Sequence, residues 1–449
     1  MTRYRWIIFL IFSILFCATG VALLLYAQGY RYHFGRKTLE KTGQLSIESK
    51  PKGASLSVNG QQSFGRALFS GGEQDGKTPE RIPGLLSGTY TVHLESDGYY
   101  PWTRVVTVES GQATLIRPAI LIRKNATDEI TPTLERTATL AAVPLSQVFV
   151  ATQNELTVFN PKTKQSRIIL RAGEPFSFVS KSPNEQSILL ASKKNAWLVG
   201  SDGRLDPLIL PRDTIDQFRW STNGDRIVGL TGGKIFQLFS RSKPRVLTTT
   251  SASDALLHGS SLIFVPKENP REVRRLSLLE KTSPEEVVVR VSSAISRIIA
   301  THGSHLVIAY GKNDLAVVDD SSDGTTQSSL RAGTEARFWD ARTLISWNDF
   351  EVFRTDFINE RAATPQLIVR RSVPIRKVEL LPEIGYIAVL FDDGSVSVIE
   401  QTGAESRNRY TLADRSIKDI TALDGKGLVW IRSESGKDVM RLETVRLVQ

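Results

Sequence analysis

The sequence has few of the residues that compact active sites and cross-linked folds require. Its 449 residues include one cysteine, two methionines and five scattered histidines. A disulfide and a cysteine-based zinc site each need at least two thiols, so the single Cys17 excludes both. The G-x-S-x-G pattern of a serine-hydrolase elbow is also missing. We therefore expect no catalytic residue, no metal site and no cofactor, and a protein that is not an enzyme.

The large C-terminal part lacks an excess of charge of either sign. The formal net charge of the whole chain is +10, but residues 1–43 hold six Lys or Arg against one acid, and residues 124–449 hold 43 against 39. A face that binds DNA or RNA concentrates its basic residues on the folded part. Nucleic acid is therefore not an expected partner.

Residues 6–26 contain no charged side chain. A helix of this length spans roughly 30 Å, the hydrocarbon thickness of a bilayer. Trp6, Tyr26 and Tyr30 suit the aromatic belts at the two membrane interfaces, so membrane lipid is an expected partner. We expect the regions 1–5 (short tail), 6–28 (transmembrane helix) and 29–43 (juxtamembrane linker).

The sequence leaves three further points about this segment open. A cleaved signal peptide is a less favoured alternative, because Leu25-Tyr26-Ala27 is a poor cleavage site. A lipidated Cys17 is also less favoured, because Phe16 precedes it. Basic residues flank the segment on both sides, and long domains cross membranes with little regard to such charges. We expect a single-pass protein with extracytoplasmic β domains, but the orientation is not fixed by the sequence.

Residues 44–123 alternate apolar and polar side chains between turn residues, which is typical of short strands with one buried face. Leu45 and Ile47 begin this pattern, and Asn59-Gly60 and Asp97-Gly98 are tight-turn pairs. We expect a small β domain, followed by a linker over residues 124–133.

The motifs of this β module occur in the order found in the PEGA domain, which the segment resembles. The matching residues are Pro51, Lys52, Gly53, Ala54, Asn59, Gly60, Gly76, Thr78, Pro79, Gly88, Gly98 and Tyr99. Lys52 replaces the Glu of the family signature, and residues 61–75 form an insertion. The resemblance implies a small β-sandwich of cell-envelope and surface proteins, without shared catalytic residues.

A match to the phosphate-binding loop overlaps this module. Residues 71–78 read GGEQDGKT, which fits G-x-x-x-x-G-K-T letter for letter. That loop needs a helix directly after the lysine, and Pro79, Pro83 and Gly84 prevent one here. We interpret the match as a turn.

From residue 134 to residue 449, short apolar runs recur without any long amphipathic helix pattern. They begin at residues 147, 187, 226, 261, 305, 343, 386 and 427. A period of about 40 residues is typical of a β-propeller, with one four-stranded blade per repeat. We expect eight blades, with seven as the alternative. Residues 134–142 either begin the first blade or complete the last one.

Details within the repeats support the same architecture. The segments 176–192 and 216–230 resemble TolB-type and WD-like propeller repeats, which implies architecture and not function. The interior tryptophans are expected in the core between blades. They are Trp197, Trp220, Trp339, Trp347 and Trp430.

Two short motifs contain residue types that bind metal ions in other proteins. His302 and His305 form an H-x-x-H pair, which on strands and turns we do not expect to share one face as it would on a helix. Residues 319–324 imitate half of a calcium loop, but Leu330 stands where a bidentate Glu is needed. We expect ordinary turns at both. Carboxylates from distant blades meeting at the propeller axis cannot be recognised from sequence.

The sequence thus predicts a mainly β protein with a transmembrane helix, a PEGA-like β-sandwich and a β-propeller. The predicted function is non-enzymatic binding or scaffolding at the cell envelope, with an envelope protein or polysaccharide as the ligand. One alternative is a propeller enzyme that acts on an envelope glycan or peptide. A second is a surface sensor that works with a membrane partner.

Overall fold

The computed structural model divides into two compact units. The first holds residues 1–125, 405–408 and 448–449, and the second holds residues 126–404 and 409–447. The structure describes residues 2–33, 38–59, 76–124, 127–134, 139–143, 147–160, 163, 165–279, 283–312, 314–321, 324–330, 333–358, 361–402, 407–413, 416–423, 425–433 and 440–448.

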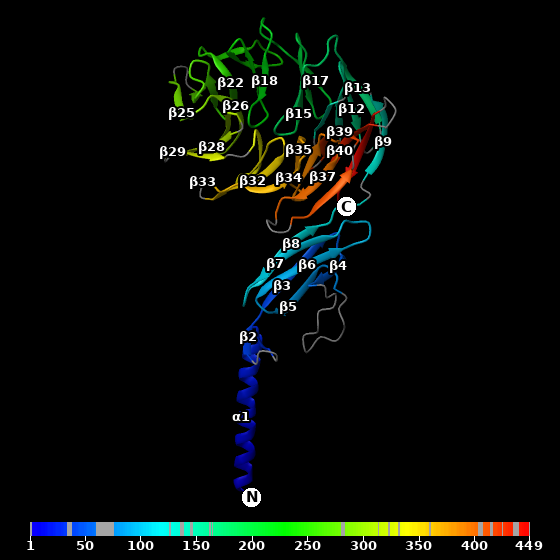
Figure 1. Cartoon of the computed structure of the whole chain (residues 1–449), viewed down its shortest axis with the longest axis vertical. Helices are drawn as coiled ribbons and strands as arrows, with labels where there is room; N and C mark the ends of the chain where they lie inside the picture. Colours follow the sequence, from blue (N-terminus) through cyan, green and yellow to red (C-terminus); the bar gives the residue numbers. More distant parts are fainter. Residues whose placement is uncertain are drawn as a thin grey trace. The chain divides into compact units, whose positions relative to one another are not determined.

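The first unit begins with a single long helix, α1 (Thr2–Ala27) (Figure 1). From Trp6 to Ala27 its mean hydropathy is 2.8 and none of it is buried within the protein, so it is long and apolar enough to cross a membrane. The helix starts four residues before the predicted segment, which corrects the expected tail over residues 1–5. No Pro or Gly stands between Thr2 and Trp6 to prevent a helix there.

A two-stranded antiparallel hairpin follows the helix directly. It consists of β1 (Tyr30–His33) and β2 (Thr38–Lys41). The predicted juxtamembrane linker over residues 29–43 therefore contains a hairpin, which was not expected. Tyr30, Tyr32 and Thr38 are residue types that favour strands, but these strands are too short to give a clear signal beside the helix.

Two three-stranded sheets then form a small β-sandwich. One has the order β5-β3-β8, with β3 (Gly43–Lys50) parallel to β8 (Ala113–Ile120) and antiparallel to β5 (Glu80–Leu85). The other has the order β4-β6-β7 and is antiparallel, with bounds Ser55–Val58, Gly88–Glu95 and Trp102–Val108. Their inner faces share one apolar core around the fully buried Trp102. This confirms the predicted fold of this module.

The second unit is built from antiparallel sheets of four strands each, apart from one sheet of five. The first four sheets are consecutive in the chain. Their strands are β10 (Thr139–Val143), β11 (Gln147–Ala151), β12 (Glu155–Asn160), β13 (Gln165–Arg171); β14 (Phe178–Lys181), β15 (Ser187–Ala191), β16 (Ala196–Gly200), β17 (Leu205–Leu208); β18 (Gln217–Trp220), β19 (Ile227–Thr231), β20 (Lys234–Leu238), β21 (Arg245–Thr248); and β22 (Ala252–His258), β23 (Ser261–Pro266), β24 (Glu272–Ser277), β25 (Glu286–Arg290).

The remaining sheets continue the pattern (Figure 1). Their strands are β26 (Ile295–His302), β27 (His305–Tyr310), β28 (Asp314–Ser321), β29 (Gly324–Leu330); β30 (Glu335–Asp340), β31 (Thr343–Trp347), β32 (Glu351–Ile358), β33 (Arg361–Ala362), β34 (Gln366–Arg370); β35 (Ile375–Leu381), β36 (Tyr386–Phe391), β37 (Val396–Glu400), β38 (Arg409–Ala413); and β39 (Ile417–Leu423), β40 (Gly427–Ser433), β41 (Met440–Arg446), β9 (Thr127–Leu134). In the described residues, each of the eight apolar runs lies on the second strand of its sheet.

The last sheet joins the two ends of this unit. Strand β9 pairs antiparallel with β41, and β10 then begins the first sheet. The predicted linker over residues 124–133 is therefore wrong from residue 127 onwards, because residues 127–133 belong to a strand. Residues 134–142 serve both roles considered for them, since Leu134 ends β9 and Thr139 begins β10.

Apolar side chains fill the space between successive sheets. One such cluster joins Val148 and Val150 of β11 to Val429 and Ile431 of β40, so the first sheet packs on the last. The first strand of each sheet is its inner strand, and β39 also contacts β10. The predicted β-propeller is confirmed by this arrangement. The number of blades stays a prediction.

Candidate functional site

The Pro51-Lys52-Gly53-Ala54 turn of the sandwich is closed by Thr78. The Thr78 hydroxyl accepts the backbone N–H of Ala54 at 3.1 Å, and its carbonyl accepts that of Gly53 at 2.7 Å. Gly53 has φ +83°, a conformation that side chains disfavour. Thr78 is buried and also contacts the Ser49 hydroxyl. Thr78 and the turn therefore form one structural unit.

The other matched residues of this module also serve its structure. Asn59 has φ 51°, and its side-chain oxygen accepts the backbone N–H of Thr91 at 2.9 Å, which fixes the end of β4 against β6. The carbonyl of Gly76 accepts the N–H of Leu56 at 2.6 Å. Tyr99 is buried in the core, after the turn at Gly98. Pro51, Lys52, Pro79 and Gly88 lie at turns and strand ends, and Gly60 lies outside the described residues.

The three predicted membrane-interface residues lie at the two ends of α1. Trp6 begins the apolar stretch with 74% of its surface exposed, and Tyr26 and Tyr30 flank its other end, half-buried. The one exposed thiol of the described residues, Cys17, lies between them on the helix. The place of these three residues at membrane interfaces stays a prediction.

A set of charged side chains occupies one equivalent position near the start of successive inner strands. Four of them follow a register shift in their strand, namely Asp254 on β22, Arg297 on β26, Lys377 on β35 and Asp419 on β39. Glu335 begins β30, between Arg297 and Lys377 in this order. The sign of the charge therefore alternates over five successive sheets. We call these five residues the inner charged belt.

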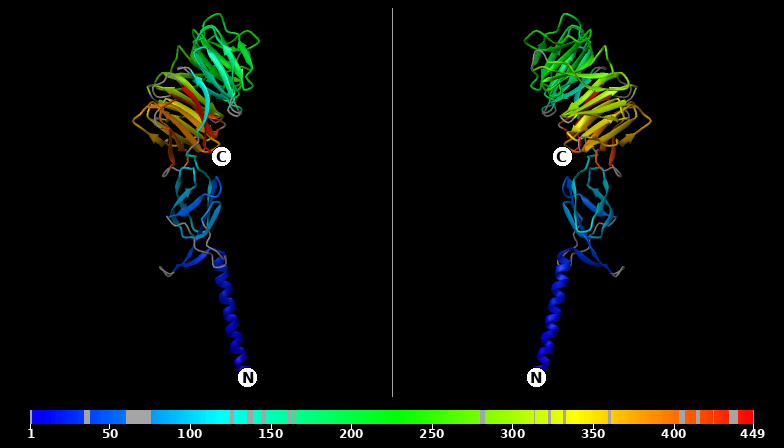
Figure 2. Two further views of the ribbon diagram at one scale, coloured as in Figure 1. Left: turned by 90° about the vertical axis from the view of Figure 1, so that its right-hand side faces the viewer. Right: turned by 90° about the vertical axis from the view of Figure 1, so that its left-hand side faces the viewer.

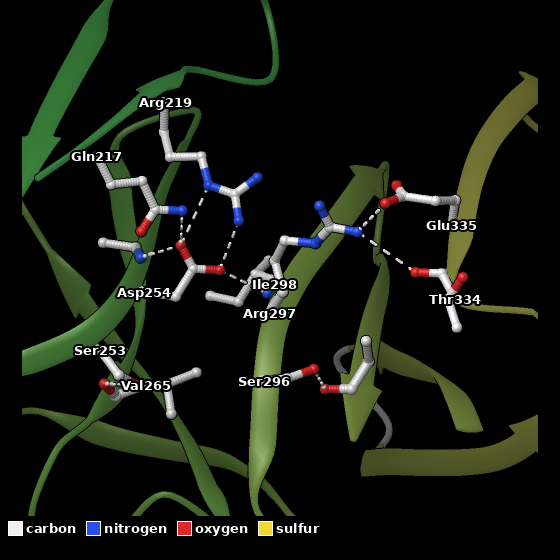
Figure 3. Close-up of polar contacts among 12 residues, drawn as sticks. Gln217, Arg219, Ser253, Asp254, Val265, Ser296, Arg297, Ile298, Thr334 and Glu335 are labelled. Atoms are coloured by element: carbon white, nitrogen blue, oxygen red, sulfur yellow. Dashed lines mark hydrogen bonds and ion pairs between the residues drawn. The ribbon is translucent and has the colours of Figure 1, made fainter. Parts of the chain in front are cut away.

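Figure 3 shows how the inner charged belt begins. The Asp254 carboxylate receives two hydrogen bonds from the Arg219 guanidinium of β18, at 3.1 and 2.8 Å. Oδ2 of Asp254 also accepts the backbone N–H of Ile298 at 2.7 Å. Arg297 pairs with Glu335 and donates to the carbonyl of Thr334. These contacts thus link four successive sheets, those that begin with β18, β22, β26 and β30.

The belt continues through the later sheets by the same chemistry. Lys377 Nζ lies 2.9 Å from Oδ1 of Asp419, and that oxygen also accepts the backbone N–H of Ile420. Arg337 and Lys377 both approach the buried Glu379, at 3.5 Å each. These contacts join neighbouring sheets of the second unit.

A second charged network lies on the fourth sheet. Glu272 of β24 receives hydrogen bonds from Arg290 at 2.9 Å and from Arg274 at 3.2 and 3.3 Å. Arg274 also reaches Glu285 at 3.1 Å. The hydrogen bond from Arg290, with that from Arg274, lowers the pKa of the Glu272 carboxyl below its usual value against the opposing effect of desolvation. These residues cross-link β24 to β25 and the segment before it.

His302 and His305 lie directly opposite one another across a two-residue hairpin, which corrects one expectation. Directly opposed residues of antiparallel strands share a face, so both rings lie on the same side of the sheet. Each packs on a phenyl ring, His302 on Phe338 at 5.4 Å and His305 on Phe357 at 4.4 Å between ring centroids. This shared face was missed because the prediction compared the spacing of the histidines with that on a helix.

Within the described residues, no group of three or more His, Cys, Asp or Glu side chains gathers in a way that suits a metal ion. Of the calcium-like segment, residues 319–321 end β28 and Gly324 begins β29, as in an ordinary hairpin, and Asp319 is buried. Four of the five interior tryptophans lie in or against the apolar clusters between sheets, and the fifth, Trp430, donates its indole N–H to Glu443. Trp220 and Trp430 are buried, and Trp197, Trp339 and Trp347 pack on those clusters.

The sequence analysis did not find the inner charged belt. Its signal was a charged residue seven to nine positions before five of the eight apolar runs, those that begin at residues 261, 305, 343, 386 and 427. Which belt residues meet depends on the order of sheets in space, and a linear pattern does not supply that order.

Comparisons with known proteins agree with both folds. The family model of the PEGA domain matches residues 42–120. A search of curated proteins finds no match. Among solved structures, the C-terminal WD40 domain of Sif2 is similar with a TM-score of 0.53 and 16% identity, over 71% of this chain and 98% of that one.

A second similar structure is BamB from Moraxella catarrhalis, with a TM-score of 0.47 and 13% identity over 71% of this chain and 99% of that one. The likeness to the Sif2 domain shows the fold of the C-terminal unit alone. The chain therefore carries a PEGA domain at residues 42–120 and a C-terminal β-propeller of WD40-like fold.

Proposed function

We propose that this chain is a single-pass membrane protein of the cell envelope, in which the PEGA domain and the β-propeller form a non-enzymatic binding or scaffold module. The observation that carries the proposal is the exposure of α1. Large apolar side chains are exposed along its length, among them Phe9, Phe12 and Leu24. Burial of one such side chain contributes about 1.5–3 kcal/mol, so a helix of them is unfavourable in water and favourable in lipid.

The two β units support a binding role. Propellers hold loops on a rigid frame of sheets, and loops so held suit the recognition of partners. The carboxylates of the inner charged belt are engaged by Arg, Lys or backbone N–H groups, which supports a structural role for them. The resemblance of residues 42–120 to PEGA domains supports a place in the envelope, with the β units on the extracytoplasmic side and an envelope protein or polysaccharide as ligand.

Thiol labelling tests the orientation. In a Cys17→Ser background, Leu279→Cys places a thiol at a site that is 80% exposed. We expect a membrane-impermeant maleimide to label this variant on intact cells, and Cys17→Ser alone to stay unlabelled. Labelling that appears only after the cells are permeabilised would place the propeller in the cytoplasm and contradict the proposed side.

The non-enzymatic role is tested on a captured ligand. Detergent-solubilised protein is incubated with envelope extract, and the bound material is identified by mass spectrometry before and after prolonged incubation. We expect bound material of unchanged mass at a fixed ratio to the protein. Progressive conversion of the ligand, beyond one equivalent per protein, would show turnover and favour the enzyme.

A further inference from the structure

The β1–β2 hairpin is held directly at the end of the apolar helix. Helix α1 ends at Ala27, and the chain turns at Gly29, whose φ of +87° favours glycine. The Gly29 carbonyl accepts both the N–H and the hydroxyl of Thr42, at 2.8 and 2.7 Å. The two ends of the hairpin are therefore held together at Gly29 and Thr42. Figure 2 shows it projecting sideways there and not along the helix axis.

The base of the hairpin is also fixed to the sandwich. The Ser110 hydroxyl donates to the Lys41 carbonyl at 2.7 Å, and the N–H of Gly111 donates to the Thr42 carbonyl at 3.1 Å. The direction of the hairpin is therefore set by hydrogen bonds on both of its sides. The hairpin is therefore a projection that is fixed to the rest of the first unit by hydrogen bonds.

One face of the hairpin carries two exposed large apolar side chains, Tyr32 and Leu39. Tyr32 lies directly opposite Leu39, and Tyr30 lies opposite Lys41, so these four side chains share a face. Tyr32 is 51% exposed and Leu39 is 48% exposed. Exposed apolar pairs on a short hairpin are unfavourable in water unless another surface covers them.

The place and the charge of the hairpin point to the surface that covers this face. Tyr32 follows Ala27 by five residues, so it lies within about 17 Å of the end of the apolar helix even if the chain is extended. Tyrosine favours the layer between hydrocarbon and water. Residues 29–43 hold four basic residues against Glu40, and each basic residue near an anionic membrane surface contributes about 1 kcal/mol of attraction.

We infer that the β1–β2 hairpin lies on the membrane surface, with Tyr32 and Leu39 in the interfacial layer and a preference for anionic headgroups. This inference rests on the proposed membrane anchor. It adds a second lipid contact that fixes the angle of the PEGA domain to the bilayer, because the hairpin base is bonded to the sandwich. A single helix alone leaves that angle free.

Fluorescence quenching in lipid vesicles tests the inference on the full chain. An environment-sensitive dye is attached to Leu39→Cys or to Tyr32→Cys, each in a Cys17→Ser background. The matched control is Leu115→Cys in the same background, because Leu115 is a leucine of the sandwich that is 65% exposed. The vesicles contain phosphatidylcholine, with or without phosphatidylglycerol, and a quencher attached to the lipid.

We expect strong quenching and a blue shift for the dye at positions 39 and 32, and none at position 115. The effect is expected to be larger with phosphatidylglycerol and to weaken with salt. Equal behaviour of positions 39, 32 and 115 would overturn the inference and leave a protein partner as the occupant of this face. Equal quenching in both lipids would overturn the preference for anionic headgroups.

The native Cys17 separates this failure from a failure of the proposed function. A dye on Cys17 in the otherwise unchanged chain reports on the middle of α1. Quenching at Cys17 without quenching at positions 39 and 32 shows an inserted helix and a hairpin away from the lipid. Absence of quenching at Cys17 contradicts the membrane anchor itself.

Discussion

Oδ2 of Asp254 lies 2.8 Å from Nη2 of Arg219, although the two residues are on neighbouring sheets of the propeller. The same oxygen accepts the backbone N–H of Ile298 on the next sheet. Asp254 is 1% exposed. One carboxylate thus connects three successive sheets, which gives the inner charged belt a mechanical role in the propeller.

Asp254→Ala is expected to destabilise the propeller by about 3 kcal/mol, because it leaves the Arg219 guanidinium and a buried N–H without their acceptor. Thermal unfolding followed by intrinsic fluorescence measures this. The control is Glu286→Gln, which breaks an exposed pair with Arg275 and is expected to cost less than about 1 kcal/mol. Equal effects of the two variants would mean that the belt does not join the sheets.

Leu442→Ala tests whether the last sheet closes on the first. Leu442 of β41 is fully buried in the cluster that includes Val148 and Val150 of β11. Removal of its side chain is expected to cost about 2–5 kcal/mol. Leu279→Ala, at an exposed leucine of the same unit, is expected to leave the midpoint of urea unfolding unchanged. An unchanged midpoint for Leu442→Ala would contradict the closure.

Thr78→Val removes the hydroxyl that accepts the Ala54 N–H while keeping the shape of the side chain. A buried donor left without an acceptor costs about 1–3 kcal/mol, so the PEGA domain is expected to unfold at lower urea concentration. Thr78→Ser retains the hydroxyl and is expected to lose less. Amide exchange at Ala54 reports on this turn alone. Exchange that stays as slow in Thr78→Val as in the unchanged chain would disprove this role of the hydroxyl.

Acid is expected to weaken the network around Glu272. Its carboxyl has a lowered pKa in the folded state because Arg290 and Arg274 bind the ionised form. The stabilisation is therefore present above the unfolded pKa of about 4.3 and is lost as the pH falls through the lower folded value. Urea midpoints measured from neutral pH downwards are expected to fall less steeply for Glu272→Gln than for the unchanged chain. An equally steep fall of the urea midpoint with pH in both proteins would contradict this role of Glu272.

The repeat was predictable from the sequence because each apolar run is buried on both faces of its sheet. Val228 and Val389, for example, are fully buried on second strands. Such continuous apolar runs can be recognised in the sequence even when the residues that pack on them are not known. The PEGA turns were also predictable, because Gly53 and Asn59 stand where the backbone has a positive φ, which glycine and asparagine adopt more readily than other residues.

The rest depends on contacts between distant residues. Strand β9 resembles a linker until β41 supplies its partner, some 300 residues later in the chain. Likewise, Arg219 and Asp254 meet only because their sheets are neighbours in space. The hairpin at Tyr32 was hidden because its strands are four residues long.

The membrane anchor is tested most directly by alkaline carbonate extraction of cell membranes. The full chain is compared with a variant in which residues 6–27, the apolar part of α1, are deleted. The account predicts that the full chain stays in the membrane pellet and that the deletion variant moves to the supernatant. Release of the full chain into the supernatant, with its mass showing that α1 is intact, would contradict the account.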